Sequence, residues 1–146
     1  MRLTWVAGIA VICCVIVSGC RRDGQADTTT TKQSNSQAAA MTEETFETEI
    51  RNYKGVALVD FWAPWCGPCN AMSPVVNALA GEMNGMAKVV KVNVDKNKNL
   101  SQEFQITGIP CFVLMRDGKE IGRRSGGCPK EELKMWIESA SKSASR

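Results

Sequence analysis

Histidine is absent from all 146 residues of the chain. Without an imidazole the protein cannot use a histidine general base, nor can it build the mixed cysteine and histidine sites that commonly hold zinc. A zinc site of four thiolates would need a second close pair after Cys66 and Cys69, but the later cysteines, Cys111 and Cys128, are far apart. We therefore expect no bound metal.

The sequence also lacks a strong excess of either charge. Its formal net charge is +3, but the segment Glu43–Ala140 carries 12 basic and 13 acidic residues, so the excess lies in the flanking segments. Aromatic residues make up only 6% of the chain, and none are interleaved with a basic stripe. These features argue against nucleic-acid binding.

No apolar run is long enough to span a bilayer comfortably, because about 20 residues are needed and the run from Trp5 to Val17 is shorter. Arg2 precedes this run, and the small residues Ser18 and Gly19 close it before Cys20. We interpret residues 1–19 as an export signal, with an uncleaved anchor helix as the alternative. The segment Val-Ser-Gly-Cys resembles the bacterial lipobox, which implies cleavage before Cys20 and lipid attachment to it.

Residues 20–41 follow as a tether rich in Thr, Gln, Ser, Asn and Ala, without a periodic apolar face. We assign residues 42–141 to a single domain and residues 142–146 to a polar tail. The resulting prediction is a domain outside the cytoplasm, on the periplasmic side in a Gram-negative cell. It would be held at a bacterial membrane through lipid on Cys20.

The domain has an α/β pattern. The predicted order is helix, strand, helix, strand, helix, hairpin and helix, with the elements at residues 42–54, 56–59, 67–83, 87–94, 100–104, 111–121 and 129–140. Thr42 is the expected N-cap of the first helix, and Asp60 is expected at the end of the first strand. This order predicts a mixed sheet covered by helices. The segment Ser36–Met41 is too polar and alanine-rich for a strand to be assigned.

Cys66 and Cys69 could form a metal clamp, a structural staple or a redox pair. They lie a helical turn apart at the start of a helix, where unpaired N–H groups and the helix dipole favour a thiolate. Pro68 stiffens the turn between them without costing a helix hydrogen bond. We therefore expect Cys66 to attack a substrate disulfide and Cys69 to resolve the mixed disulfide.

The motif WCGPC at residues 65–69, after the run VDFWAPW, resembles the active site of thioredoxins. The resemblance covers Thr42 to about Ala140 and includes, at matching spacing, Ile109-Pro110, Asp117-Gly118 and Gly126-Gly127. It implies a thioredoxin fold, with a central mixed sheet and helices on both faces. It also implies thiol-disulfide exchange by a monomer without a cofactor.

The resemblance further implies roles for individual residues. Asp60 would be a buried carboxyl group that takes the proton of Cys69, Lys91 would tune its charge, and Pro110 would be a cis proline opposite the cysteines. The implied docking surface consists of Trp65, Gly67, Pro68, Ile109, Pro110, Gly126 and Gly127, above Trp62. Simpler alternatives are a capping role for Asp60, an ordinary edge charge at Lys91 and the commoner trans bond at Pro110.

Three residues depart from the family pattern. Asn70 stands where lysine is usual, which removes a positive charge next to Cys69. Cys111 and Cys128 replace threonine and an aliphatic residue, and hairpin pairing would bring both to the active-site end of the sheet. We expect a second disulfide between them, with two buried free thiols as the alternative.

The sequence as a whole predicts an extracytoplasmic protein-disulfide reductase. Its substrates would be exported proteins with disulfides, and a membrane dithiol carrier would supply its electrons. A reductase for cytochrome c maturation is a rival, although such relatives usually have an insertion for which the run from Cys69 to Pro110 leaves no room. A tethered chaperone or binding module without redox activity is the other alternative.

Overall fold

The computed structural model describes residues 37–143. The predicted signal at residues 1–19, the lipidated Cys20, most of the tether and the last three residues of the tail lie outside this range. Within it, no helix has the length and apolar character needed to cross a membrane.

The centre of the domain is a five-stranded mixed sheet in the order β1-β3-β2-β4-β5. The strands are β1 (Ala39–Met41), β2 (Val56–Trp62), β3 (Ala87–Asn93), β4 (Cys111–Arg116) and β5 (Lys119–Ser125). The first three strands run parallel to one another, whereas β4 is antiparallel to both β2 and β5. The predicted α/β class with a mixed sheet is confirmed.

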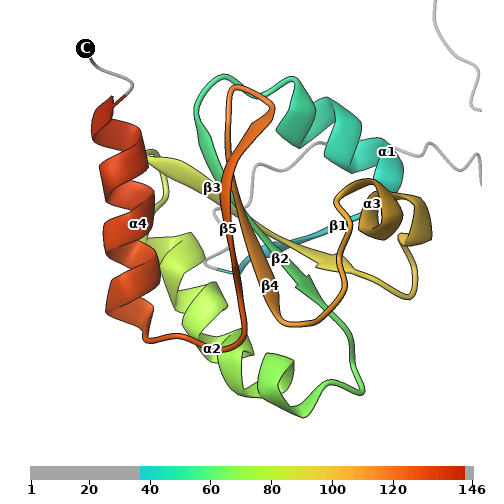
Figure 1. Ribbon diagram of the computed structural model, residues 1–146. Helices are drawn as coiled ribbons and strands as arrows, with labels where there is room; N and C mark the ends of the chain where they lie inside the picture. Colours follow the sequence, from blue (N-terminus) through green and yellow to red (C-terminus); the bar gives the residue numbers. More distant parts are fainter. Residues whose placement is uncertain (1–36, 144–146) are drawn as a thin grey trace, which may run out of the picture. The chain divides into compact units, whose positions relative to one another are not determined.

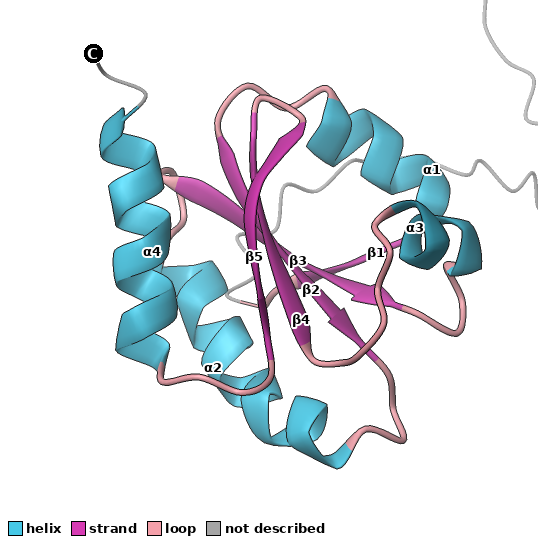
Figure 2. Ribbon diagram, in the orientation of Figure 1, coloured by secondary structure: helices cyan, strands magenta, loops and turns pink. Residues whose placement is uncertain are grey.

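Helices cover both faces of this sheet (Figures 1 and 2). One face packs against α1 (Glu43–Phe46), the π-helical segment η1 (Glu47–Arg51) and α3 (Lys98–Glu103). The other face packs against α2 (Gly67–Glu82) and α4 (Lys130–Lys142). Because side chains alternate along each strand, successive residues of β2 enter opposite cores, which explains why the whole run of Val56 to Phe61 is buried.

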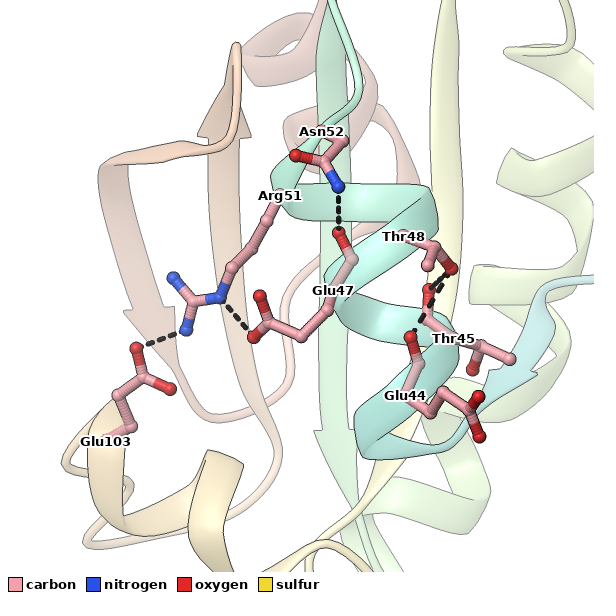
Figure 3. Close-up of polar contacts among 7 residues, drawn as sticks. All are labelled: Glu44, Thr45, Glu47, Thr48, Arg51, Asn52 and Glu103. Carbon is pink, nitrogen blue, oxygen red and sulfur yellow. Dashed lines mark hydrogen bonds and ion pairs between the residues drawn. The ribbon is translucent and has the colours of Figure 1, made fainter.

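Thr42 is the N-cap of the first helix, as the sequence predicts. The Thr42 hydroxyl accepts from the Thr45 backbone N–H, and the Thr45 hydroxyl accepts from the Thr42 N–H in return. Such a reciprocal cap satisfies two backbone donors at the start of the helix. Arg51 at the end of η1 then binds both Glu47 and Glu103, so it ties this segment to α3 (Figure 3).

An edge strand forms where the sequence carries no strand signal. Residues 39–41 pair in parallel with Val90–Val92 of β3, although Ala39 and Ala40 are exposed and only Met41 is buried. The backbone ladder to β3 therefore defines β1, rather than its side chains. This strand occupies the last residues of the segment assigned to the tether. At the other end, α4 extends through Lys142 into the segment assigned to the tail.

Candidate active site

The two motif cysteines lie where β2 gives way to α2. Cys66 has an extended backbone and is the N-cap of α2, and its sulfur accepts from the Cys69 backbone N–H at 3.2 Å. Pro68 occupies the first turn, where its missing N–H costs no helix bond. The two sulfurs form a disulfide, with Cα atoms 5.2 Å apart. The structure thus shows the oxidised form of the pair.

The two sulfur atoms differ in their access to solvent. Both cysteines are buried in a small cluster with Ala63, but Cys66 keeps a little exposed surface and Cys69 almost none. A protein substrate can therefore approach Cys66 more readily than Cys69. This difference fits an attacking role for Cys66 and a resolving role for Cys69.

Asp60 lies inside β2, not at its end as the sequence suggested. Its side chain projects to the face of the sheet that α2 covers, it is only 1% exposed, and neither carboxyl oxygen has a hydrogen-bond partner within residues 37–143. Burial raises the pKa of this carboxyl group to about 7, while the positive charge of Lys91 opposes the rise. A capping role for Asp60 is excluded, because a cap would have a backbone partner.

Lys91 lies on β3 directly beside Asp60 in the strand register. Because β3 is an interior strand and Lys91 is 7% exposed, the alternative of an ordinary edge charge is wrong. Its ammonium group donates to the Ser73 hydroxyl and lies 4.5 Å from the centre of the Trp62 ring. A hollow of about 660 Å³ along β1 and the segment after β3 reaches Lys91 and Trp62.

Pro110 follows a cis peptide bond, as the resemblance implies. Ile109 packs against the cluster that contains both cysteines. The Pro110 carbonyl accepts from the Gly126 N–H at 2.8 Å, and Gly126 adopts a φ of +88°, which favours glycine. These contacts bring the start of β4 and the end of β5 together beside the disulfide, where the sequence placed the docking surface.

Trp65 projects from the segment before Cys66 and is 70% exposed. Its indole N–H donates to the Asp95 carboxylate at 2.9 Å, which fixes the ring at one edge of a shallow hollow. The hollow is lined by Trp65, Val94, Ile106, Thr107, Gly108 and Ile109. Sequence reasoning missed Asp95, because an acidic residue after a strand carries no sign of the tryptophan that it binds.

Two further polar residues of α2 were also missed as parts of the site. The Asn70 side chain donates to the Pro64 carbonyl at 3.0 Å and so links the first turn of α2 to the segment before Cys66. Ser73 accepts from Lys91. The sequence singled out Asn70 only for the charge that it lacks, and a serine on an amphipathic helix gives no signal.

The predicted second disulfide is wrong. Cys111 and Cys128 are both free, and their side chains enter the two different cores on opposite faces of the sheet. The hairpin does bring their backbones to the same end, since Cys111 pairs with Ser125. A disulfide also requires the two Cβ atoms to point toward each other, which residues on opposite faces cannot achieve. Burial raises the pKa of both thiols.

A cysteine pair at a helix N-terminus, a buried carboxyl group behind it and a cis proline beside it define a thiol-disulfide oxidoreductase. Comparison with known proteins agrees with this class. The family model described as Thioredoxin matches residues 37–139. The chain belongs to the thioredoxin family, and the thiol-disulfide oxidoreductase activity predicted from the sequence is confirmed.

Individual relatives resemble the chain over nearly their whole length. Thioredoxin 1 of Nostoc sp. strain PCC 7120 is 40% identical over 103 residues, which are 70% of this chain and 96% of the relative. Thioredoxin 2 of Chlorobaculum tepidum is 44% identical over 63% of this chain and 84% of its own. The solved structure of a mutant thioredoxin from Halobacterium salinarum superposes with a TM-score of 0.67. It is 33% identical and covers 74% of this chain and 94% of its own.

Proposed function

We propose that this chain is a protein-disulfide reductase that works outside the cytoplasm, anchored to a bacterial membrane through lipid on Cys20. The observation that carries the thiol-disulfide exchange chemistry is the buried Asp60, without a hydrogen-bond partner within residues 37–143, on the sheet face covered by the helix of Cys69. Arg2, the apolar run and the Val-Ser-Gly-Cys segment support the location. Exported proteins with disulfides would be its substrates.

The reaction begins with the reduced pair. The Cys66 thiolate attacks one sulfur of a substrate disulfide, forms a mixed disulfide and releases the other substrate sulfur as a thiolate. Cys69 then gives its proton to Asp60 and attacks the Cys66 sulfur, which releases the second substrate thiolate. Two electrons have passed to the substrate, and the pair is left in the oxidised form that the structure shows.

A membrane dithiol carrier would return the enzyme to its reduced form by the same exchange in reverse. A flexible tether over residues 20–38, ahead of β1, would span about 24 Å r.m.s., enough to reach a neighbouring membrane protein. The segment between Cys69 and Pro110 contains α2, β3 and α3 and no additional element. This gives no support to the rival assignment as a cytochrome c maturation reductase.

Two substitutions test the redox role directly. With a protein substrate that carries an accessible disulfide, Cys66→Ser should abolish reduction, and Cys69→Ser should accumulate a mixed disulfide on Cys66. Cys128→Ser is the matched control, because Cys128 is a half-buried thiol outside the reaction, and it should leave the rate unchanged. A Cys66→Ser variant that still prevents aggregation of unfolded exported chains as well as wild type would instead support the chaperone alternative.

Anchoring is tested by fractionating bacterial cells that express the full chain. Wild type should be found with the membranes, carry lipid on its new terminal cysteine and be accessible from outside the cytoplasm. Cys20→Ser should lose the lipid, whereas Cys14→Ser should behave as wild type, since Cys14 would leave with the signal. Wild-type protein that is recovered unlipidated in the cytoplasm would contradict the proposal.

A further inference from the structure

The Lys91 ammonium group has two potential partners. Asp60 is its neighbour across the β2–β3 ladder, and both side chains project to the face that α2 covers. Yet Lys91 donates to the Ser73 hydroxyl of α2, with the Trp62 ring as its second contact. Within residues 37–143 both Asp60 oxygens remain without any partner. The buried charge has thus been paired with a neutral hydroxyl while a carboxyl group nearby is left alone.

Electrostatics alone would favour the opposite arrangement. An opposite charge within about 4–6 Å stabilises a carboxylate and lowers its pKa by about 1–3 pH units. A buried carboxylate without such a partner ionises unfavourably. The difference matters for the reaction, because a carboxylate already paired with an ammonium group is a poorer acceptor for the Cys69 proton.

We propose that Ser73 is a positioning residue that holds the Lys91 ammonium group against α2 and thereby leaves Asp60 unpaired to accept the proton of Cys69. The Ser73 hydroxyl offers Lys91 an acceptor without a negative charge. Trp62 supplies a second, purely electrostatic contact through its ring face. Together they allow a buried lysine to stay near Asp60, where its field acts on the carboxyl group, without forming an ion pair.

Few other groups can act on Asp60. On β4 its register neighbour is the apolar Phe112, and Cys111 next to it projects into the opposite core. From α4, the apolar residues Leu133, Trp136, Ile137 and Ala140 pack on this face. Among the described residues, the charge of Lys91 acts on Asp60, and the Cys111 thiol interacts electrostatically with it. The Cys128 thiol borders the core on the same face as Asp60. A shift in the Asp60 titration on changing Ser73 can be ascribed to Lys91.

The test is an NMR titration of the Asp60 carboxyl carbon in the oxidised full chain, where Cys66 and Cys69 do not ionise. The chain has no histidine, so no imidazole titrates in the same range. We expect Ser73→Ala to lower the Asp60 midpoint by about one pH unit or more, because Lys91 turns to the carboxylate. Ser73→Thr, which keeps a hydroxyl, should restore the wild-type midpoint. The reduced Ser73→Ala enzyme should resolve its mixed disulfide more slowly at neutral pH.

The variant Lys91→Met tests whether the effect of Ser73→Ala depends on Lys91. It should raise the Asp60 midpoint. Adding Ser73→Ala to Lys91→Met should leave this raised midpoint unchanged. Ser141→Ala is the control for loss of a helix serine, since the Ser141 hydroxyl donates to a backbone carbonyl of α4. An unchanged midpoint in Ser73→Ala, or an equal fall with and without Lys91, would overturn the proposal. So would wild-type NMR showing the Lys91 ammonium protons hydrogen-bonded to Asp60.

Discussion

Asp60 is the residue where burial and charge act most clearly against each other. Its carboxyl group lies in an apolar core, and burial raises its pKa to about 7 even though Lys91 lowers it. A pKa in this range lets the group gain and lose a proton at ambient pH, which is what a proton acceptor for Cys69 requires. The position that serves the chemistry therefore destabilises the fold whenever Asp60 is ionised.

This conflict predicts how stability depends on pH. The folded pKa of Asp60 is raised above the unfolded value of 3.8, so its protonated form favours folding. The free energy of unfolding should fall as pH rises from about 4 to about 7 and level off above that range. Replacing Asp60 by Asn removes the ionisation and should stabilise the oxidised protein at pH 8 by up to about 4 kcal/mol.

Urea unfolding of wild type and Asp60→Asn across this pH range measures the effect. The difference between the two proteins isolates Asp60, because all other groups titrate in both. The gap should narrow toward zero near pH 4. A gap that stays constant with pH, or widens on acidification, would show that Asp60 is not a buried neutral acid in the folded state.

Sequence reasoning reached some residues of the site and not others for a physical reason. Cys66 and Cys69 lie in a contiguous motif, and Pro110 lies at a characteristic distance from it. Asp60 follows an apolar run, which implies that it is buried. The Ser73 side chain on α2 contacts Lys91 of β3, which no local pattern encodes. The disulfide predicted between Cys111 and Cys128 does not form, because Cys111 projects from β4 into one core whereas Cys128, beyond the end of β5, packs against the other.

At the scale of elements, the turn between β4 and β5 shows how the hairpin is aligned with β2. The Asp117 N–H donates to the Gly55 carbonyl at 3.0 Å, and the Gly55 N–H donates to the Asp117 carboxylate at 3.0 Å. Gly118 has a φ of +78°, and a Cβ built there would lie 1.9 Å from the Arg51 carbonyl oxygen. The turn is thus closely packed against the end of η1.

Gly118→Ala should therefore destabilise the domain by about 3 kcal/mol or more, through both the left-handed backbone and the overlap with Arg51. Gly85→Ala is the matched control, because Gly85 has a φ of +85° but open space around its Cβ position. It should cost only about 1–2 kcal/mol. Thermal or urea unfolding measures both, and equal losses in the two variants would contradict the packing argument.

Most elements could be predicted because their signals are local. The apolar runs of β2 and β3, the turn at Asp117-Gly118 and the cap at Thr42 are all visible in the sequence. The strand β1 was not, since Ala39 and Ala40 contribute little more than backbone and form a strand only because β3 offers a ladder. Its existence depends on pairing with Val90–Val92, which lie far away along the chain.

For the molecule as a whole, the two faces of the sheet serve different purposes. Residues of α1, η1 and α3 pack against one face of the sheet, and this core contains neither of the motif cysteines nor Asp60. The other face brings α2, with its cysteines, over Asp60 and Lys91 of β2 and β3. The predicted docking surface around Trp65 and Pro110 lies at the end of the sheet where these elements meet. A rigid scaffold therefore presents one reactive sulfur to a protein substrate.

We propose that the Cys66–Cys69 pair acts as a reductant of substrate disulfides. The most direct test is the reduction potential of the pair, measured by equilibrating the full chain with glutathione buffers and quantifying the two forms. We predict a value near that of thioredoxin, about −270 mV. A value near about −120 mV, typical of a strong oxidant of exported thiols, would contradict the assignment as a reductase.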